Sequence, residues 1–166
     1  MAVRVGDASA VPRTLVQVNG DASLGRVSPD GRWLAYTTNI SGRQEIWVQG
    51  YPTSGDAKPF LVSTEGGRDS VWSRDGKWLY FLSNEHTAMF KVSIQTERSN
   101  WGLPEKVCEL DPLVYVAALN VPSYDVAPDG RFIFARNVTP QSPLEIRVVL
   151  NWFEELKRLV PVKESK

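Results

Sequence analysis

Side chains that could carry out chemistry are few in this chain and are not grouped along it. His86 is the only histidine and Cys108 the only cysteine among 166 residues. A metal centre or a Ser-His-Asp triad would need partners for His86, but it stands in a polar stretch, and no G-x-S-x-G nucleophile motif exists in the chain. We therefore expect His86 to be an exposed loop residue. We predict no enzyme activity, catalytic residue, metal site or cofactor.

Cys108 lies in residues 106–110, whose pattern is that of a β-strand. A small buried hydrophobic residue is the favoured interpretation there, over a reactive thiol. A single cysteine also excludes a disulfide within the chain. The adjacent carboxylates Glu154 and Glu155 fit a solvated helix face better than acid–base catalysis.

Three aspartates, each followed by glycine, form the strongest pattern. Their oxygens could bind a cation, but no dense run of oxygen ligands accompanies them. A hairpin turn explains them better, because proline presets the first corner, aspartate tolerates the second, and glycine adopts the left-handed conformation of a bulged hairpin. Arg74 replaces the proline in the second copy, and this position of a type I turn accepts most residues. The turn residues are Ser28, Pro29, Asp30 and Gly31; Ser73, Asp75 and Gly76; and Pro128, Asp129 and Gly130.

These turns repeat together with the strands that follow them. The three aspartates are separated by 45 and 54 residues, and an aromatic residue (Trp33, Trp78 or Phe132) stands three residues after each. A second short strand follows about fifteen residues after each aspartate. Short strands repeating every 40–50 residues are typical of β-propeller blades. An ordinary β-sandwich is the alternative, but it leaves the repeat unexplained.

The strands after the turns are apolar on both faces. Residues 78–82 (WLYFL) place Trp78, Tyr80 and Leu82 on one face and Leu79 and Phe81 on the other. A sheet with one wet face would alternate apolar and polar residues. We therefore expect these strands to be packed between two neighbouring sheets, as in a propeller blade.

The repeats divide the chain into one all-β domain, predicted to be a partial, open β-propeller of about three four-stranded antiparallel blades with a short C-terminal helix. Residues 1–19 are expected to be irregular and to end in the outer strand (14–18) of a preceding blade. The blades are 20–64, 65–121 and 122–151, followed by a helix and tail at 152–166. The expected strands are 24–28, 33–38, 45–49 and 59–63 in the first blade, 69–73, 78–83, 89–95 and 105–110 in the second, and 124–127, 132–137 and 145–150 in the third.

Two segments leave alternatives open. The apolar residues 113–119 are expected to cover an edge or extend a strand, although a short helix also fits. At the C-terminal end, Asn151 suits an N-cap, Glu154 completes a capping box, and an apolar stripe follows at helical spacing. We favour a helix there over a fourth strand of the third blade.

The composition of the chain argues against one class of partner. The chain has 19 basic and 19 acidic residues, and this balance argues against a nucleic-acid partner, whose binding proteins normally show a basic excess. The N-terminal residues lack the continuous apolar core of a signal peptide, and no run of residues is long and apolar enough for a transmembrane segment.

The three turns and their aromatic strands resemble the WD-like repeats of the TolB-type β-propeller family over residues 14–150. The terminal sequence VLNWFEELKRLVP is similar to the ends of propeller domains attached to bacterial serine/threonine protein kinases or transcriptional regulators. Such propellers have six or more blades, so the resemblance implies a C-terminal part of a larger bacterial protein, or a homodimer that completes a six-bladed ring. We favour the first. The resemblance implies a location in the bacterial periplasm or in an extracytoplasmic domain. The sequence of this chain does not itself determine the compartment.

Function is expected on the loops, because loops on a rigid scaffold carry most binding residues. Loops 39–44, 84–87 and 137–144 should emerge on the same face as 19–23, 65–70 and 112–123, opposite the Asp-Gly turns. The candidate interaction face consists of Arg43, Arg68, Asp69, Glu85 and His86. We expect a non-catalytic module for protein–protein interaction or ligand sensing, with an unidentified protein partner. The alternative is a propeller accessory to an enzyme, as a peptidase-gating domain or a kinase-associated sensor.

Overall fold

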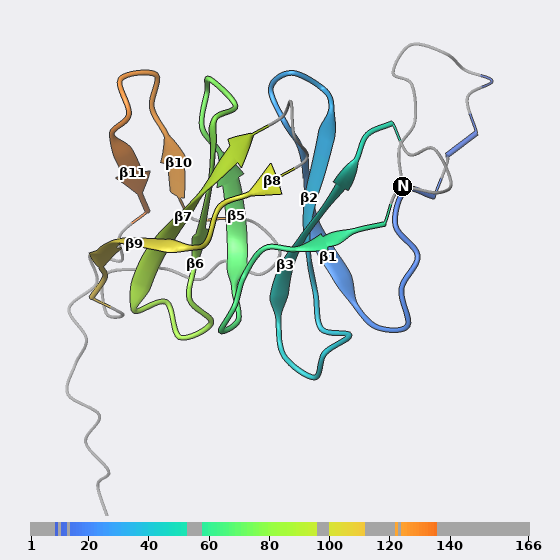
Figure 1. Ribbon diagram of the computed structural model, residues 1–166, viewed down its shortest axis with the longest axis horizontal. Helices are drawn as coiled ribbons and strands as arrows, with labels where there is room; N and C mark the ends of the chain where they lie inside the picture. Colours follow the sequence, from blue (N-terminus) through green and yellow to red (C-terminus); the bar gives the residue numbers. More distant parts are fainter. Residues whose placement is uncertain are drawn as a thin grey trace, which may run out of the picture.

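The computed structural model describes residues 9, 11, 12, 14–52, 58–95, 100–111, 122 and 124–135. Within them the protein contains β-strands and no helix, and the strands form three antiparallel sheets (Figure 1). The all-β prediction is confirmed at this level. The expected segments at 113–119 and 145–150 and the expected C-terminal helix lie outside the described residues.

The first sheet has the strand order β1-β2-β3-β4. Its β2 has the predicted bounds, and β1 and β3 differ from the prediction by one or two residues at their ends. Strand β4 is shorter than expected and pairs with β3 only opposite Trp47 and Val48. The strands are β1 (Ala22–Val27), β2 (Trp33–Thr38), β3 (Glu45–Gly50) and β4 (Phe60–Leu61).

The second sheet repeats this order but divides its outer strand in two. Both β8 and β9 pair with β7, β8 at its C-terminal end and β9 at its N-terminal end. The short β8 was not predicted. In the third sheet β10 pairs with β11. The strands are β5 (Arg68–Trp72), β6 (Trp78–Leu82), β7 (Ala88–Gln95), β8 (Asn100–Trp101) and β9 (Glu105–Glu109), then β10 (Tyr124–Val126) and β11 (Phe132–Phe134).

The prediction of a strand at residues 14–18 is wrong, because this segment is not a strand and joins none of the sheets formed by the described residues. It is held instead by a side chain, since Gln49 Nε2 donates a hydrogen bond of 2.9 Å to the carbonyl oxygen of Leu15. Gln49 belongs to β3 and is buried. The segment therefore lies against the first sheet without pairing with it.

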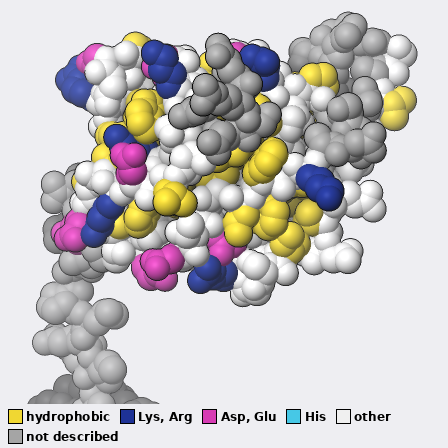
Figure 2. All heavy atoms as spheres, viewed as in Figure 1, with side chains coloured by type: hydrophobic (Ala, Val, Ile, Leu, Met, Phe, Trp, Pro, Cys, Tyr) yellow, Lys and Arg dark blue, Asp and Glu magenta, His cyan; other side chains and the backbone are white. Residues whose placement is uncertain are grey.

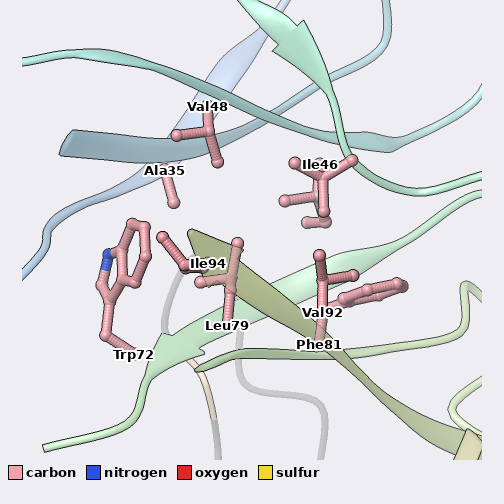
Figure 3. Close-up of a cluster of buried hydrophobic side chains, with 9 residues drawn as sticks. Ala35, Ile46, Val48, Trp72, Leu79, Phe81, Val92 and Ile94 are labelled. Atoms are coloured by element: carbon pink, nitrogen blue, oxygen red, sulfur yellow. The ribbon is translucent and has the colours of Figure 1, made fainter. Parts of the chain in front are cut away.

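The main hydrophobic core lies between the first and second sheets (Figure 3). Ala35, Ile46 and Val48 of the first sheet face Leu79 and Phe81 of the second. These five residues are 0–2% exposed, so their side chains are shielded from water where the two sheets meet. Burial of so much apolar surface is the dominant favourable term in stacking the two sheets.

A second core lies between the second and third sheets. Leu82 and Met89 pack with Tyr124 and Val126, and Tyr80 and the β11 phenylalanines lie against this cluster. The Tyr80 and Phe132 rings meet edge to face with centroids 4.9 Å apart. Strand β6 thus buries Leu79 and Phe81 on one side and Leu82 on the other, where Tyr80 is partly buried, which confirms the predicted two-sided burial of the middle sheet.

The Asp-Gly turns form as expected from their residue types. The amide of each glycine donates to the carbonyl three residues earlier, over 2.9–3.0 Å, and Gly31, Gly76 and Gly130 have φ of +70°, +71° and +83°. In the first two copies a serine closes the turn, because Ser73 Oγ donates to Asp75 Oδ1 (2.7 Å) and accepts from the Trp78 amide (2.9 Å). The Ser73 hydrogen bond and the Lys77 amide lower the pKa of Asp75.

Candidate functional site

The predicted interaction face lies at the end of the sheets opposite the Asp-Gly turns. In Figure 1 the β1–β2, β5–β6 and β10–β11 turns stand at the upper edge, and the β2–β3 and β6–β7 loops at the lower edge. The two lower loops are joined, because the Gln44 carbonyl accepts hydrogen bonds from the Gly67 amide (2.9 Å) and Asn84 Nδ2 (3.2 Å). Residues from both sheets therefore form one surface here.

Arg43 is fixed on this surface by a buried carboxylate. Its Nε lies 2.6 Å from Glu45 Oε1, and Nη2 donates to the Thr64 carbonyl over 3.0 Å. The Glu45 side chain is 2% exposed and also accepts from Ser63 Oγ, whereas the Arg43 side chain remains 53% exposed. The guanidinium thus has a fixed position and an open side.

Arg68, Asp69 and His86 form a second cluster, and the sequence alone does not predict that these three side chains meet. The Asp69 Oδ2 atom lies 3.6 Å from both Arg68 Nε and His86 Nε2. The side chains of Arg68 and His86 are 23% and 15% exposed, and that of Asp69 is 2% exposed. The Asp69 carbonyl accepts a 2.7 Å hydrogen bond from the Tyr124 hydroxyl, which ties the cluster to the third sheet.

The expectation that His86 is an exposed loop residue is wrong. Its turn repeats the geometry of the Asp-Gly turns: the His86 amide donates to the Ser83 carbonyl (3.0 Å), and Ser83 Oγ accepts from the Thr87 and Ala88 amides. His86 thus occupies the glycine position, with φ of +58°. The sequence signal for this turn is Ser83, which stands at the same position as Ser28 and Ser73. The turn is hard to recognise from sequence because histidine replaces the glycine.

Asp69 also has a left-handed backbone, with φ of +56°. It sits where the pairing of β5 with β6 is interrupted between Arg68 and Val71. The first sheet has the same irregularity between Ser23 and Arg26, with Leu24 at φ of +57°. A bulge re-aims the side chain of the residue it contains. Asp69 is accordingly buried and does not belong to the exposed part of the face.

Burial and the Arg68 charge lower the pKa of His86, and Asp69 opposes them only in part. The imidazole is therefore neutral near pH 7. Its role in the resting protein is to pack against the Asp69 carboxylate rather than to supply a positive charge to the surface.

Glu85, the remaining predicted residue, lines a small cavity beside this cluster. The cavity has a volume of about 90 Å³, and its walls include Thr64, Glu65, Ser83 and Glu85 around Phe81 and Phe90. The structure thus places Arg43, Arg68, Glu85 and His86 on one surface, with Asp69 beneath them.

The prediction that Cys108 is a buried hydrophobic residue is wrong, since it is exposed. It lies on β9, and every residue of this strand is exposed because, within the described part of the chain, β9 pairs only with β7 and has no neighbour on its other side. Partial desolvation nevertheless raises the pKa of its thiol.

Within the described part of the chain, no group of three or more His, Cys, Asp or Glu side chains is placed to hold a metal ion. No helix among these residues is long and apolar enough to cross a membrane. Comparison with protein-family models and with curated proteins finds no match to this chain.

Proposed function

We propose that the chain is a non-catalytic interaction module, built from consecutive blades of an incomplete β-propeller of the TolB type. We further propose that a protein partner binds the surface that carries Arg43, Arg68, Glu85 and His86, which we call the loop face. The first strands of the sheets support the architecture, since β5 contacts both β1 and β10. Trp72 Nε1 of β5 donates to the Arg26 carbonyl of β1 over 3.0 Å. In a propeller these would be the innermost strands.

An open groove follows these strands, as half of a central channel would. It has a volume of about 440 Å³ and is lined by residues of all three sheets, among them Arg26, Trp72 and Asp125. The groove is consistent with a ring that this chain forms only in part, because closed propellers have four to eight blades around a central channel.

The two outer faces of the stack also fit an incomplete ring. A hollow of about 450 Å³ remains on the first sheet, lined by Leu15, Leu24, Leu34 and Tyr36 among others. On the third sheet, Ile133 is 62% exposed on the side away from the second sheet. Further blades from a longer protein would cover these faces, and a second copy of the chain is the alternative.

The observation that carries the interaction proposal is the geometry of Arg43. A half-exposed guanidinium held by a buried carboxylate and a backbone carbonyl loses little side-chain entropy when it contacts a partner. Arginine is also among the residues that contribute most to protein interfaces. The loop face therefore has a preorganised contact residue, and Arg68 lies in the neighbouring cluster.

The proposal is tested by affinity capture from the source cells with paired variants. Arg43→Gln with Arg68→Gln removes both charges but leaves an amide for each carboxylate to bind. The matched control is Arg32→Gln with Arg131→Gln, in the turns at the opposite end. We expect partner recovery to fall at least about tenfold with the first pair only, with thermal unfolding showing that both are folded. Equal recovery with both pairs would contradict the proposal.

A further inference from the structure

The cavity beside Glu85 has a floor made of two aromatic rings. Phe81 and Phe90 are stacked, with centroids 5.5 Å apart and an interplanar angle of 18°. Phe81 is 2% exposed, so it is fixed in the core between the first two sheets. Thr64 and Ser83 also line the cavity. The lower part of this cavity is thus apolar and rigid.

The mouth of the cavity is acidic. Glu65 and Glu85 both line it and are both exposed. The nearby arginines do not neutralise them, because Arg43 is paired with Glu45, and Arg68 with Asp69. Among the residues that the structure describes, neither Glu65 nor Glu85 forms an ion pair. Figure 2 shows acidic side chains, with a basic side chain among them, along the lower margin of the molecule, where these loops lie in Figure 1.

We propose that this cavity receives a lysine side chain from the partner polypeptide, an inference that rests on the proposed function of the loop face. The methylene stem would lie over the phenylalanine rings, and the ammonium group would reach the two glutamates. Cations bind favourably over aromatic faces, and lysine commonly buries its stem while its head stays near water.

The volume of the cavity suits one side chain rather than a whole small molecule. Small-molecule pockets are about 300–1,000 Å³, whereas this one is about 90 Å³. A narrow cavity suits the linear lysine stem better than the planar guanidinium of arginine.

The surroundings favour a polypeptide as the source of the amine. Arg43 binds the carbonyl of Thr64, which itself lines the cavity, so the half-exposed guanidinium lies beside the mouth. A segment that inserts a lysine could therefore offer main-chain carbonyls or a carboxylate to Arg43. A free amine would make no such second contact.

The test is a titration of the full, ¹⁵N-labelled chain, followed by amide chemical shifts. The probe is N-acetyl-lysine N-methylamide, and the uncharged comparison is the norleucine analogue of equal length. We expect lysine-dependent shifts at Gly66, Ser83 and Glu85, with the norleucine probe binding about tenfold more weakly. Glu65→Gln with Glu85→Gln should abolish the difference between probes, while Glu105→Gln with Glu109→Gln on β9 should preserve it.

Three outcomes would overturn the inference: no shifts at the cavity, equal binding of the norleucine probe, or binding of butylamine as tight as that of the lysine probe. The last would indicate a site for free amines. Because the capture experiment changes Arg43 and Arg68 and leaves both cavity glutamates intact, its result separates failure of this inference from failure of the proposed function.

Discussion

The Nε2 atom of His86 lies 3.6 Å from Oδ2 of Asp69, and both residues have a left-handed backbone, with φ of +58° and +56°. Two non-glycine residues in this conformation are thus directed at each other, one from a turn and one from a strand bulge. Strained backbone of this kind persists only where the surrounding structure enforces it. The pair therefore joins the β6–β7 turn to the bulge of β5 on the loop face.

The left-handed turn gives a prediction at position 86. Both His86→Ala and His86→Gly remove the contact with Asp69, but only alanine retains a Cβ that disfavours positive φ. We predict that the alanine variant is less stable than the glycine variant by about 1 kcal/mol in urea unfolding. The same pair at Glu85, whose φ is not positive, should show no advantage for glycine. A glycine variant no more stable than alanine at position 86 would contradict the assigned geometry.

His86 should also make the stability of the folded protein depend on pH. Burial and Arg68 lower its folded-state pKa below the ordinary value of 6.5, so the unfolded chain binds a proton at higher pH than the folded protein does. The stability from this residue is present above pH 6.5 and is lost as the pH falls from that value through the lower folded-state pKa. We predict that the urea midpoint of the native chain drops between pH 7 and pH 5, and drops less in His86→Asn. Equal drops would show that His86 is not the titrating group.

The junction between the first two sheets depends on Gly66. Its φ is +93°, and a Cβ there would meet Asn84 Nδ2 at 2.3 Å. We predict that Gly66→Ala lowers the free energy of unfolding by about 1–3 kcal/mol, since it adds both strain and a clash. Gly25→Ala is the matched control, because its Cβ would meet only Leu34 Cδ1 at 3.7 Å. Comparable losses in the two variants would rule out this explanation.

The serine of the repeated turn contributes to stability. Ser73 Oγ makes two hydrogen bonds, with Asp75 and with the Trp78 amide, and Ala127 stands at the corresponding position of the third turn. We predict that Ser73→Ala costs about 1–2 kcal/mol in denaturant unfolding. Ser41→Ala, which removes one exposed contact of 3.3 Å to the Arg43 carbonyl, should cost much less. A negligible loss for Ser73→Ala would show that the turn does not need the hydroxyl.

The all-β class and most strands were predictable because their signals are local. The Asp-Gly turns fix where each hairpin reverses, and the uninterrupted run of apolar residues at 78–82 predicts that both faces of the strand are covered. Trp78 was expected to join the buried face, but it is only partly buried, with Lys91 Nζ 4.4 Å from the ring centroid. Its position near the strand end, rather than its residue type, decides its exposure.

The site was less predictable because its contacts join distant parts of the chain. Asp69 meets His86 only because a bulge turns it inward and because a turn accepts histidine in place of glycine. Cys108 looked like a core residue from its neighbours, but its strand is an edge strand, and pairing order is a long-range property. Residues 14–18 have strand-like composition and no strand to pair with among the described residues.

The most direct test of the central claim, an incomplete ring open at both ends, is light scattering on the purified chain with a hydrophobic dye added in parallel. We predict a species that binds the dye through the outer faces of the first and third sheets. Leu24→Ser on the first sheet and Ile133→Ser on the third should each reduce the dye signal. A monodisperse, dye-silent monomer would contradict the claim, and a dye-silent dimer would show that two copies close the ring in place of further blades.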